Sequence, residues 1–123
     1  MSPTEPEPLT LAEVVRRAVE ICDAGARSRD VQDLLARLED ADEPITAVPD
    51  IEERMEAEAA AIDPDEPDPA LTMARAITVY LAHRRDELDE DGETLLRLAA
   101  RAEFGGDPPP AVAAWLVEQG VAV

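Results

Sequence analysis

Few side chains in this sequence are of the types that act as nucleophiles or as bases near neutral pH. The 123 residues include one histidine, His83, and one cysteine, Cys22. Cys22 falls on an apolar helical stripe with no second cysteine, which is typical of a small core side chain. Ser28 is placed to cap a helix and Ser2 lies in a Pro- and Glu-rich stretch, so neither serine has a base that would make it a nucleophile. We therefore predict no catalytic residues and a protein that is not an enzyme.

Two patterns match metal sites only in part. The acids from Glu87 onward and Gly92 fit the first six positions of a calcium loop, but Leu98 stands at the twelfth, where a bidentate Glu is required. His83 lies one helical turn before Glu87, yet a di-metal carboxylate bundle needs a second histidine. We predict no metal and no cofactor. An enzyme remains a third hypothesis, in which a buried carboxylate with a raised pKa near Glu87 or His83 acts as acid or base.

Acidic residues dominate the charge and gather in the middle of the chain. The sequence has 29 acids and 11 bases, all of them Arg, for a formal net charge of -18. Residues 39–68 hold 13 of the acids and a single base, Arg54. This uneven distribution argues against a halophilic coat and favours a local stretch that is either solvated or binds a partner. Prolines interrupt the stretch, most densely at residues 63–69.

A helix predicted from residue 51 to 62 is the candidate binding element of this acidic stretch. Its apolar stripe is sparse, so we expect the helix to be peripheral or mobile. Our first hypothesis is a non-enzymatic protein-protein interaction or regulatory protein, whose acidic helix docks on the basic surface of another protein with apolar anchors. The same stripe also suits pairing with a second copy, as a homodimer. The predicted partner-binding residues are Ile51, Glu52, Glu53, Met55, Glu56, Glu58 and Ile62.

The first two predicted helices support an alternative. Residues 11–24 and 29–41, with Gly25 in the intervening turn, have the length of a helix-turn-helix. Arg27 and Arg29 would then meet the phosphates of DNA. The acids of the second helix oppose such binding, since affinity for nucleic acid depends on neutralising phosphates. A DNA-binding regulator is therefore the second hypothesis, and under the first we expect no nucleic-acid partner.

Capping residues predict where these helices begin and end. Thr10 with Glu13 forms the pattern of a capping box. Ser28 is an N-cap candidate for the second helix, and Asp68 before a proline is one for the fourth. Gly25 is expected to end the first helix in a left-handed backbone conformation.

A central helix organises the predicted fold. The segment from residue 69 to about 88 is apolar on most of its circumference, which is typical of a helix surrounded by others. No segment alternates like a strand, so we predict an all-α protein: a compact bundle of five to six short helices around this one. Residues 10–123 are predicted to form one helical domain, and residues 1–9 a flexible arm without the features of a signal peptide. The longest nearly apolar run, 70–82, is shorter than the roughly 20 residues of a membrane span, so we expect a buried helix and no membrane anchor. The single cysteine is compatible with a reducing compartment, and the cytoplasm is the expected location.

Overall fold

The computed structural model describes residues 10–23, 25–62, 68–84, 91–105 and 107–121. Within them the secondary structure is helical, without a strand. No helix in this part of the chain combines the length and the apolar composition needed to cross a bilayer. The elements are α1 (Leu11–Cys22), α2 (Arg29–Leu38), a 3-10 helix (Ile45–Ala47), α3 (Ile51–Ile62), α4 (Pro69–His83), α5 (Gly92–Phe104) and α6 (Pro110–Glu118).

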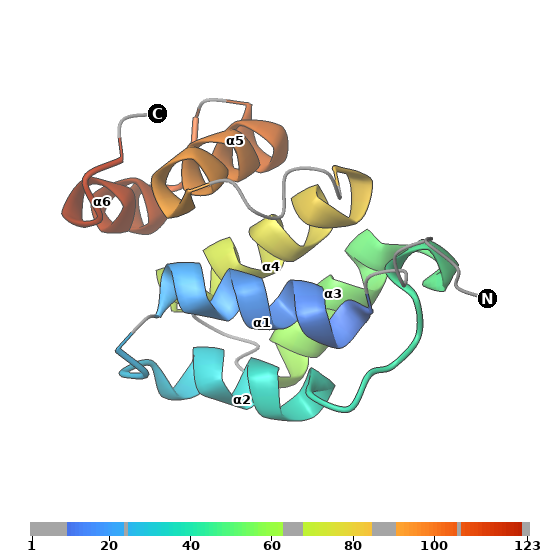
Figure 1. Cartoon of the computed structure of the whole chain (residues 1–123). Helices are drawn as coiled ribbons and strands as arrows, with labels where there is room; N and C mark the ends of the chain where they lie inside the picture. Colours follow the sequence, from blue (N-terminus) through green and yellow to red (C-terminus); the bar gives the residue numbers. More distant parts are fainter. Residues whose placement is uncertain (1–9, 24, 63–67, 85–90, 106, 122–123) are drawn as a thin grey trace.

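The predicted central helix is confirmed as α4 (Figure 1), with α1, α2 and α3 packed on one side of it and α5 and α6 on another. Leu71, Ile77 and Leu81 are fully buried along its length. Burial of each such side chain stabilises the fold by about 1.5–3 kcal/mol. The single buried polar residue of the described core, Thr78, donates its hydroxyl hydrogen to the Ala74 carbonyl at 2.9 Å, which satisfies both groups. The all-α bundle around an apolar helix is therefore as predicted.

The helix α4 is shorter than the sequence predicted. It ends at His83, because Arg84 leaves the helical backbone with φ -130° and ψ 60°. The predicted end near residue 88 is thus too late. Residues 85–90, which hold most of the calcium-like acidic pattern, lie outside the described residues, as does the arm predicted for residues 1–9.

Three predicted N-caps are confirmed. The hydroxyl of Thr10 accepts from the Glu13 amide at 3.2 Å, and that of Ser28 accepts from the Val31 amide at the same distance. The carboxylate of Asp68 accepts from the amide at residue 70 at 3.0 Å. Caps of this kind are worth about 1 kcal/mol each. They fix where α1, α2 and α4 begin.

The predicted end of the first helix is wrong. The helix α1 ends at Cys22 rather than at residue 24, and the left-handed residue of the turn is Ala26, with φ 52°, instead of Gly25. The cause is Asp23, whose carboxylate accepts backbone hydrogen bonds from Arg27 and Ser28, both at 2.8 Å. A side chain therefore shapes this turn, and the glycine is not required for it.

The acidic middle of the chain is packed more closely than expected. On the inner side of α3, Ile51, Met55 and Ala59 have exposed fractions of 7%, 0% and 9%, in contact with the core formed with α2 and α4. Ile45 and Val48, in the segment before α3, are buried as well. The prediction of a peripheral or mobile α3 is therefore corrected: the sparse stripe is sufficient because three of its members, Ile51, Met55 and Ala59, are buried in the core.

Candidate protein-interaction surface

The outer side of α3 carries the carboxylates that the sequence singled out. Glu52, Glu53 and Glu56 are exposed, and we refer to these three residues as the acidic face. Ile51 and Met55 point the other way and belong to the core. The structure thus brings the predicted acids together on the surface, but it does not present these two apolar residues as anchors, because the bundle uses them itself.

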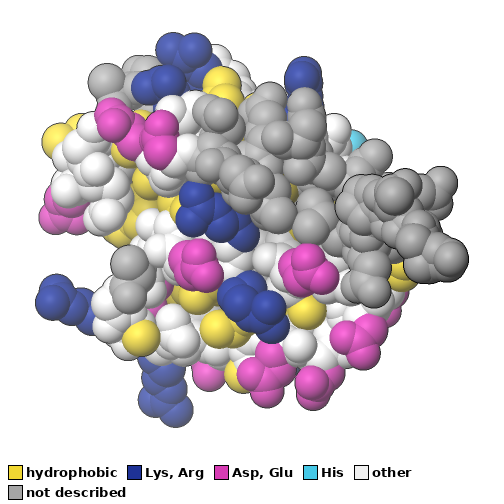
Figure 2. All heavy atoms as spheres, viewed as in Figure 1, with side chains coloured by type: hydrophobic (Ala, Val, Ile, Leu, Met, Phe, Trp, Pro, Cys, Tyr) yellow, Lys and Arg dark blue, Asp and Glu magenta, His cyan; other side chains and the backbone are white. Residues whose placement is uncertain are grey.

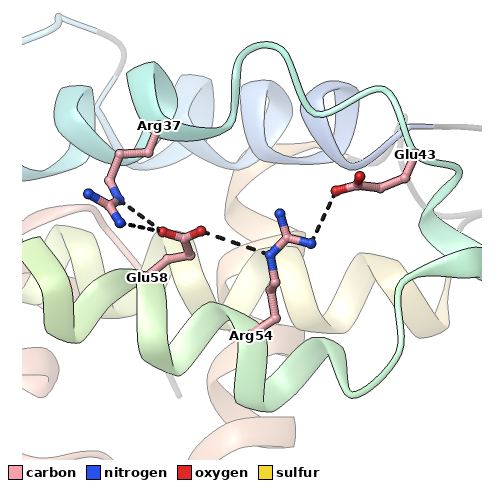
Figure 3. A network of polar contacts seen from close by, with 4 residues as sticks. All are labelled: Arg37, Glu43, Arg54 and Glu58. Atoms are coloured by element: carbon pink, nitrogen blue, oxygen red, sulfur yellow. Dashed lines mark hydrogen bonds and ion pairs between the residues drawn. The ribbon is translucent and has the colours of Figure 1, made fainter.

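An ion-pair network holds α3 against α2 and against the segment before α3 (Figure 3). The guanidinium of Arg37, on α2, contacts Glu58 Oε1 through Nη2 at 2.8 Å and donates to it from Nε at 2.9 Å. On the other side of the same carboxylate, Arg54 Nε lies 3.9 Å from Glu58 Oε2, and Arg54 Nη1 lies 3.1 Å from Glu43 Oε1. Glu58 therefore links two arginines that come from different helices.

Glu58 is a structural residue in this arrangement. Its side chain is 19% exposed, which is less than that of either arginine partner. Partial shielding and the double contact with Arg37 place its contribution near the upper end of the range for surface ion pairs, about 1 kcal/mol. Sequence reasoning assigned Glu58 to partner binding together with the other glutamates. In the structure, Glu58 instead joins α3 to α2 through its contacts with Arg37.

The same network pairs the arginine of α3, Arg54, with carboxylates outside the acidic face. Arg54 is the single base between residues 39 and 68, and its guanidinium is directed to Glu43 and Glu58. Within the described part of the chain, no ion pair involves Glu52, Glu53 or Glu56. Among the described residues, no arginine is therefore in an ion pair with the acidic face.

The three glutamates are also close enough to repel one another. Residues three or four apart lie on the same side of a helix, so Glu56 is a neighbour of both Glu52 and Glu53. Each like-charge pair of this kind destabilises a helix by about 0.2–0.5 kcal/mol. In Figure 2, further acidic side chains lie along the lower part of the face in view, where α2 and the loop after it lie in Figure 1. A basic partner would relieve this repulsion.

His83 lies beside the acidic face, which the sequence did not indicate. A hollow of about 520 Å³ at the start of α3 is lined by Asp50, Glu52 and Glu53 together with His83 from the end of α4. Sequence reasoning paired His83 with Glu87, which lies outside the described residues. In the part of the chain that the structure covers, no group of three His, Cys, Asp or Glu side chains is arranged to hold a metal ion.

The remaining chemistry-bearing residue, Cys22, is a core side chain as predicted, with an exposed fraction of 7%. Burial raises the pKa of its thiol, and the negative charges of Asp23 and Asp68 raise it further. The thiol therefore stays protonated at neutral pH, whereas a nucleophile or a metal ligand must be a thiolate.

The supposed helix-turn-helix differs from that motif in its dimensions. Residues 23–28 connect α1 and α2, whereas the motif has a turn of three or four residues. The second helix ends at Leu38 instead of extending to residue 41.

No protein-family model, no curated protein and no solved structure matches the chain.

Proposed function

We propose that this protein is a non-enzymatic interaction module that docks on a basic protein surface through the acidic face of α3. One observation carries the proposal. In the described part of the chain, Glu52, Glu53 and Glu56 are exposed and form no ion pair, on a helix whose other side is anchored in the core and whose own arginine is engaged elsewhere. A rigidly mounted cluster of uncompensated charge favours association with an oppositely charged surface and costs stability otherwise.

The mode of docking in this proposal is mainly electrostatic. Ile51 and Met55 are buried, so Ile62 is the predicted apolar anchor that still reaches the surface. It lines a hollow of about 380 Å³ between α2 and α3 with Ala36 and Ala61. A partner with basic side chains for the acidic face and one apolar side chain for this hollow would fit both. Electrostatic complementarity of this kind raises association rates more than it raises affinity.

The other hypotheses have less support. Pairing with a second copy through the α3 stripe requires Ile51 and Met55, which are buried, and two acidic faces would repel each other. DNA binding is opposed by the net charge of -18 and by the dimensions of the turn between α1 and α2. An enzyme would need a carboxylate with a raised pKa in a cleft, whereas hydrogen bonds lower the pKa of Asp23, which lines one. A cytoplasmic location is part of the first proposal, in keeping with a single cysteine that stays a thiol.

The experiment compares two variants that lose the same charge. The first replaces the acidic face by Glu52→Gln, Glu53→Gln and Glu56→Gln. The control removes three exposed acids near α5 and α6, by Glu93→Gln, Asp107→Asn and Glu118→Gln. Each immobilised full chain is incubated with lysate of the source organism, and bound proteins are identified and quantified by mass spectrometry at low and high salt.

The expected result is a basic protein that is captured by the unchanged chain and the control, lost from the α3 variant, and released as salt is raised. Capture that is equal for all three chains would refute docking through the acidic face. Capture that is lost equally from both variants would mean that net charge alone, rather than this surface, binds the partner.

A further inference from the structure

A second hollow of about 520 Å³ lies where three segments distant in the sequence meet, residues 21–28, 68–70 and 115–119. Its walls come from the end of α1, the turn before α2, the start of α4, and α6. In Figure 2 the surface is indented on the left between α6 and that turn. We call it the α1/α6 cleft; the lining residues that matter for its chemistry are Ile21, Asp23, Ser28, Asp68, Trp115 and Gln119.

Ser28 holds the two carboxylates of the α1/α6 cleft in place. Its backbone amide donates to Asp23 Oδ2 at 2.8 Å, and its hydroxyl donates to Asp68 Oδ2 at 2.6 Å. Each carboxylate has further donors: the Arg27 amide and Gln32 Nε2 for Asp23, and the Ala70 amide for Asp68. Asp23 and Asp68 are thus fixed at one cleft although 44 residues separate them along the chain.

Neutral donors fix these carboxylates without removing their charge. Burial by itself would raise the pKa of Asp23, but hydrogen bonds from Arg27, Ser28 and Gln32 and the charge of Arg27 outweigh it and lower the pKa. A carboxylate oxygen has more than one acceptor site, so two or three bound donors leave room for another. Among the described residues, the cleft is lined by one cation, Arg27, whose side chain lies near Gly25, and by two anions.

The lining of the α1/α6 cleft also includes apolar and aromatic side chains. Trp115 of α6 and Ile21 of α1 are both half-buried there. The face of an indole ring attracts a cation within about 6 Å, and it also covers the alkyl stem that carries such a cation. Carboxylates that line the same cleft as a tryptophan are therefore complementary to an organic cation that has both N–H donors and an apolar stem.

We propose that the α1/α6 cleft binds an organic cation with an alkylammonium or guanidinium head, for which Asp23 and Asp68 accept the N–H groups and Trp115 contacts the stem. The head belongs either to a free small molecule or to a Lys or Arg side chain of another protein. This site is independent of the acidic face, since the two share no lining residue.

Trp115 provides the measurement, because it is the only tryptophan of the chain. The full chain is titrated with butylammonium, with butylguanidinium and with the neutral butanol, while the tryptophan emission is recorded. We expect a saturable change with either cation and none with butanol. Capped tripeptides Gly-Arg-Gly and Gly-Lys-Gly form a second arm: affinity at least tenfold above that of the free cations identifies a protein side chain as the ligand, and equal or lower affinity identifies a small molecule.

Three single variants locate the site. Asp23→Asn and Asp68→Asn keep a side-chain acceptor for the turn and the cap, and each is expected to weaken binding about tenfold, the usual worth of a charge-assisted hydrogen bond. Glu56→Gln removes the same charge from the acidic face and should leave binding unchanged. Circular dichroism verifies that each variant is folded.

A measurement on the unchanged chain keeps the test independent of the variants. Amide NMR shifts induced by butylguanidinium should concentrate at residues 21–28, 68–70 and 115–119. Shifts spread over the acidic face instead, a response to butanol as large as to the cations, or no saturable change would overturn the proposal. Because the acidic face is not involved, these results and those of the pull-down are separately decisive.

Discussion

Carboxylates serve in two different ways on α3 and in the α1/α6 cleft. On α3, Glu58 lies between two arginines and is neutralised, while Glu52 and Glu56 extend into solvent unpaired. In the cleft, Asp23 and Asp68 accept hydrogen bonds from amides and a hydroxyl. These neutral donors fix the side-chain conformations without neutralising the charge. Solvated charges attract a partner over a Debye length of about 8–10 Å, whereas fixed charges in a hollow select a ligand by its geometry.

The prediction with the largest expected effect on stability tests whether α3 is part of the core. Met55 is fully buried, and Met55→Ala should lower the free energy of unfolding by about 2–5 kcal/mol, as truncations in well-packed cores do. Ile62→Ala, at a half-buried position of the same helix, is the control and should cost clearly less. Urea unfolding followed by circular dichroism measures both. Equal, small losses would mean that α3 is a peripheral element after all.

The second test concerns the serine that fixes the cleft. Ser28→Ala removes the cap of α2 and the donor to Asp68, and we expect a loss of about 1–2 kcal/mol. Thr10→Ala is the matched control, because it removes a cap of the same kind at the start of α1, where the hydroxyl is bonded to Glu13 among the described residues. The excess loss for Ser28→Ala measures the bond to Asp68. If the two losses are equal in urea unfolding, the Ser28–Asp68 bond contributes nothing to stability.

The third test concerns the neutralised carboxylate on α3. Glu58→Gln breaks the contacts with Arg37 and Arg54 and should cost about 0.5–1 kcal/mol at low salt, and less in 1 M salt, since screening weakens ion pairs. Glu20→Gln, in an exposed pair with Arg17 at 3.6 Å, is the control and should have nearly no effect. A loss for Glu58→Gln that is the same at both salt concentrations would show that its contribution is not electrostatic.

Local patterns in the sequence predicted much of the fold. Thr10, Ser28 and Asp68 were identified as caps because an N-cap satisfies amides two or three residues away. The helix α4 was recognised as central because a helix that is apolar on nearly all sides must be surrounded. The error at Gly25 is local as well: the carboxylate of Asp23 binds the next free amides, and this replaces the conformational freedom of a glycine.

What the sequence did not predict depends on contacts between distant segments. The burial of Met55 is set by the groove between α2 and α4, and the partner of Arg37 is Glu58, 21 residues away. No spacing rule joins Asp23 to Trp115, so the α1/α6 cleft has no signature along the chain. The candidate carboxylates of α3 were found because they are close in sequence; their division into structural and exposed residues required the coordinates.

The smallest expected effects on stability have opposite signs in the α1/α6 cleft and on α3. The ordinary pKa of an Asp side chain is about 3.9, and hydrogen bonds hold the pKa of Asp23 below it. The ionised form of Asp23 therefore stabilises the fold at neutral pH. That stability is present above the unfolded-state pKa and is lost as the pH falls through the lower, folded-state pKa. Asp23→Asn should therefore be less stable than the unchanged chain at pH 7, and the gap should narrow below about pH 4.

On α3, loss of a carboxylate is expected to raise the stability of the fold instead of lowering it. Glu56→Gln removes like-charge repulsion with Glu52 and Glu53, so it should raise the free energy of unfolding by about 0.2–0.5 kcal/mol, and added salt should erase the gain. Urea midpoints across pH and salt measure this pair of variants together. If Glu56→Gln is destabilising at low salt, its carboxylate has a partner within the fold. The acidic face would then contain a second structural glutamate like Glu58, with less charge to offer a basic surface.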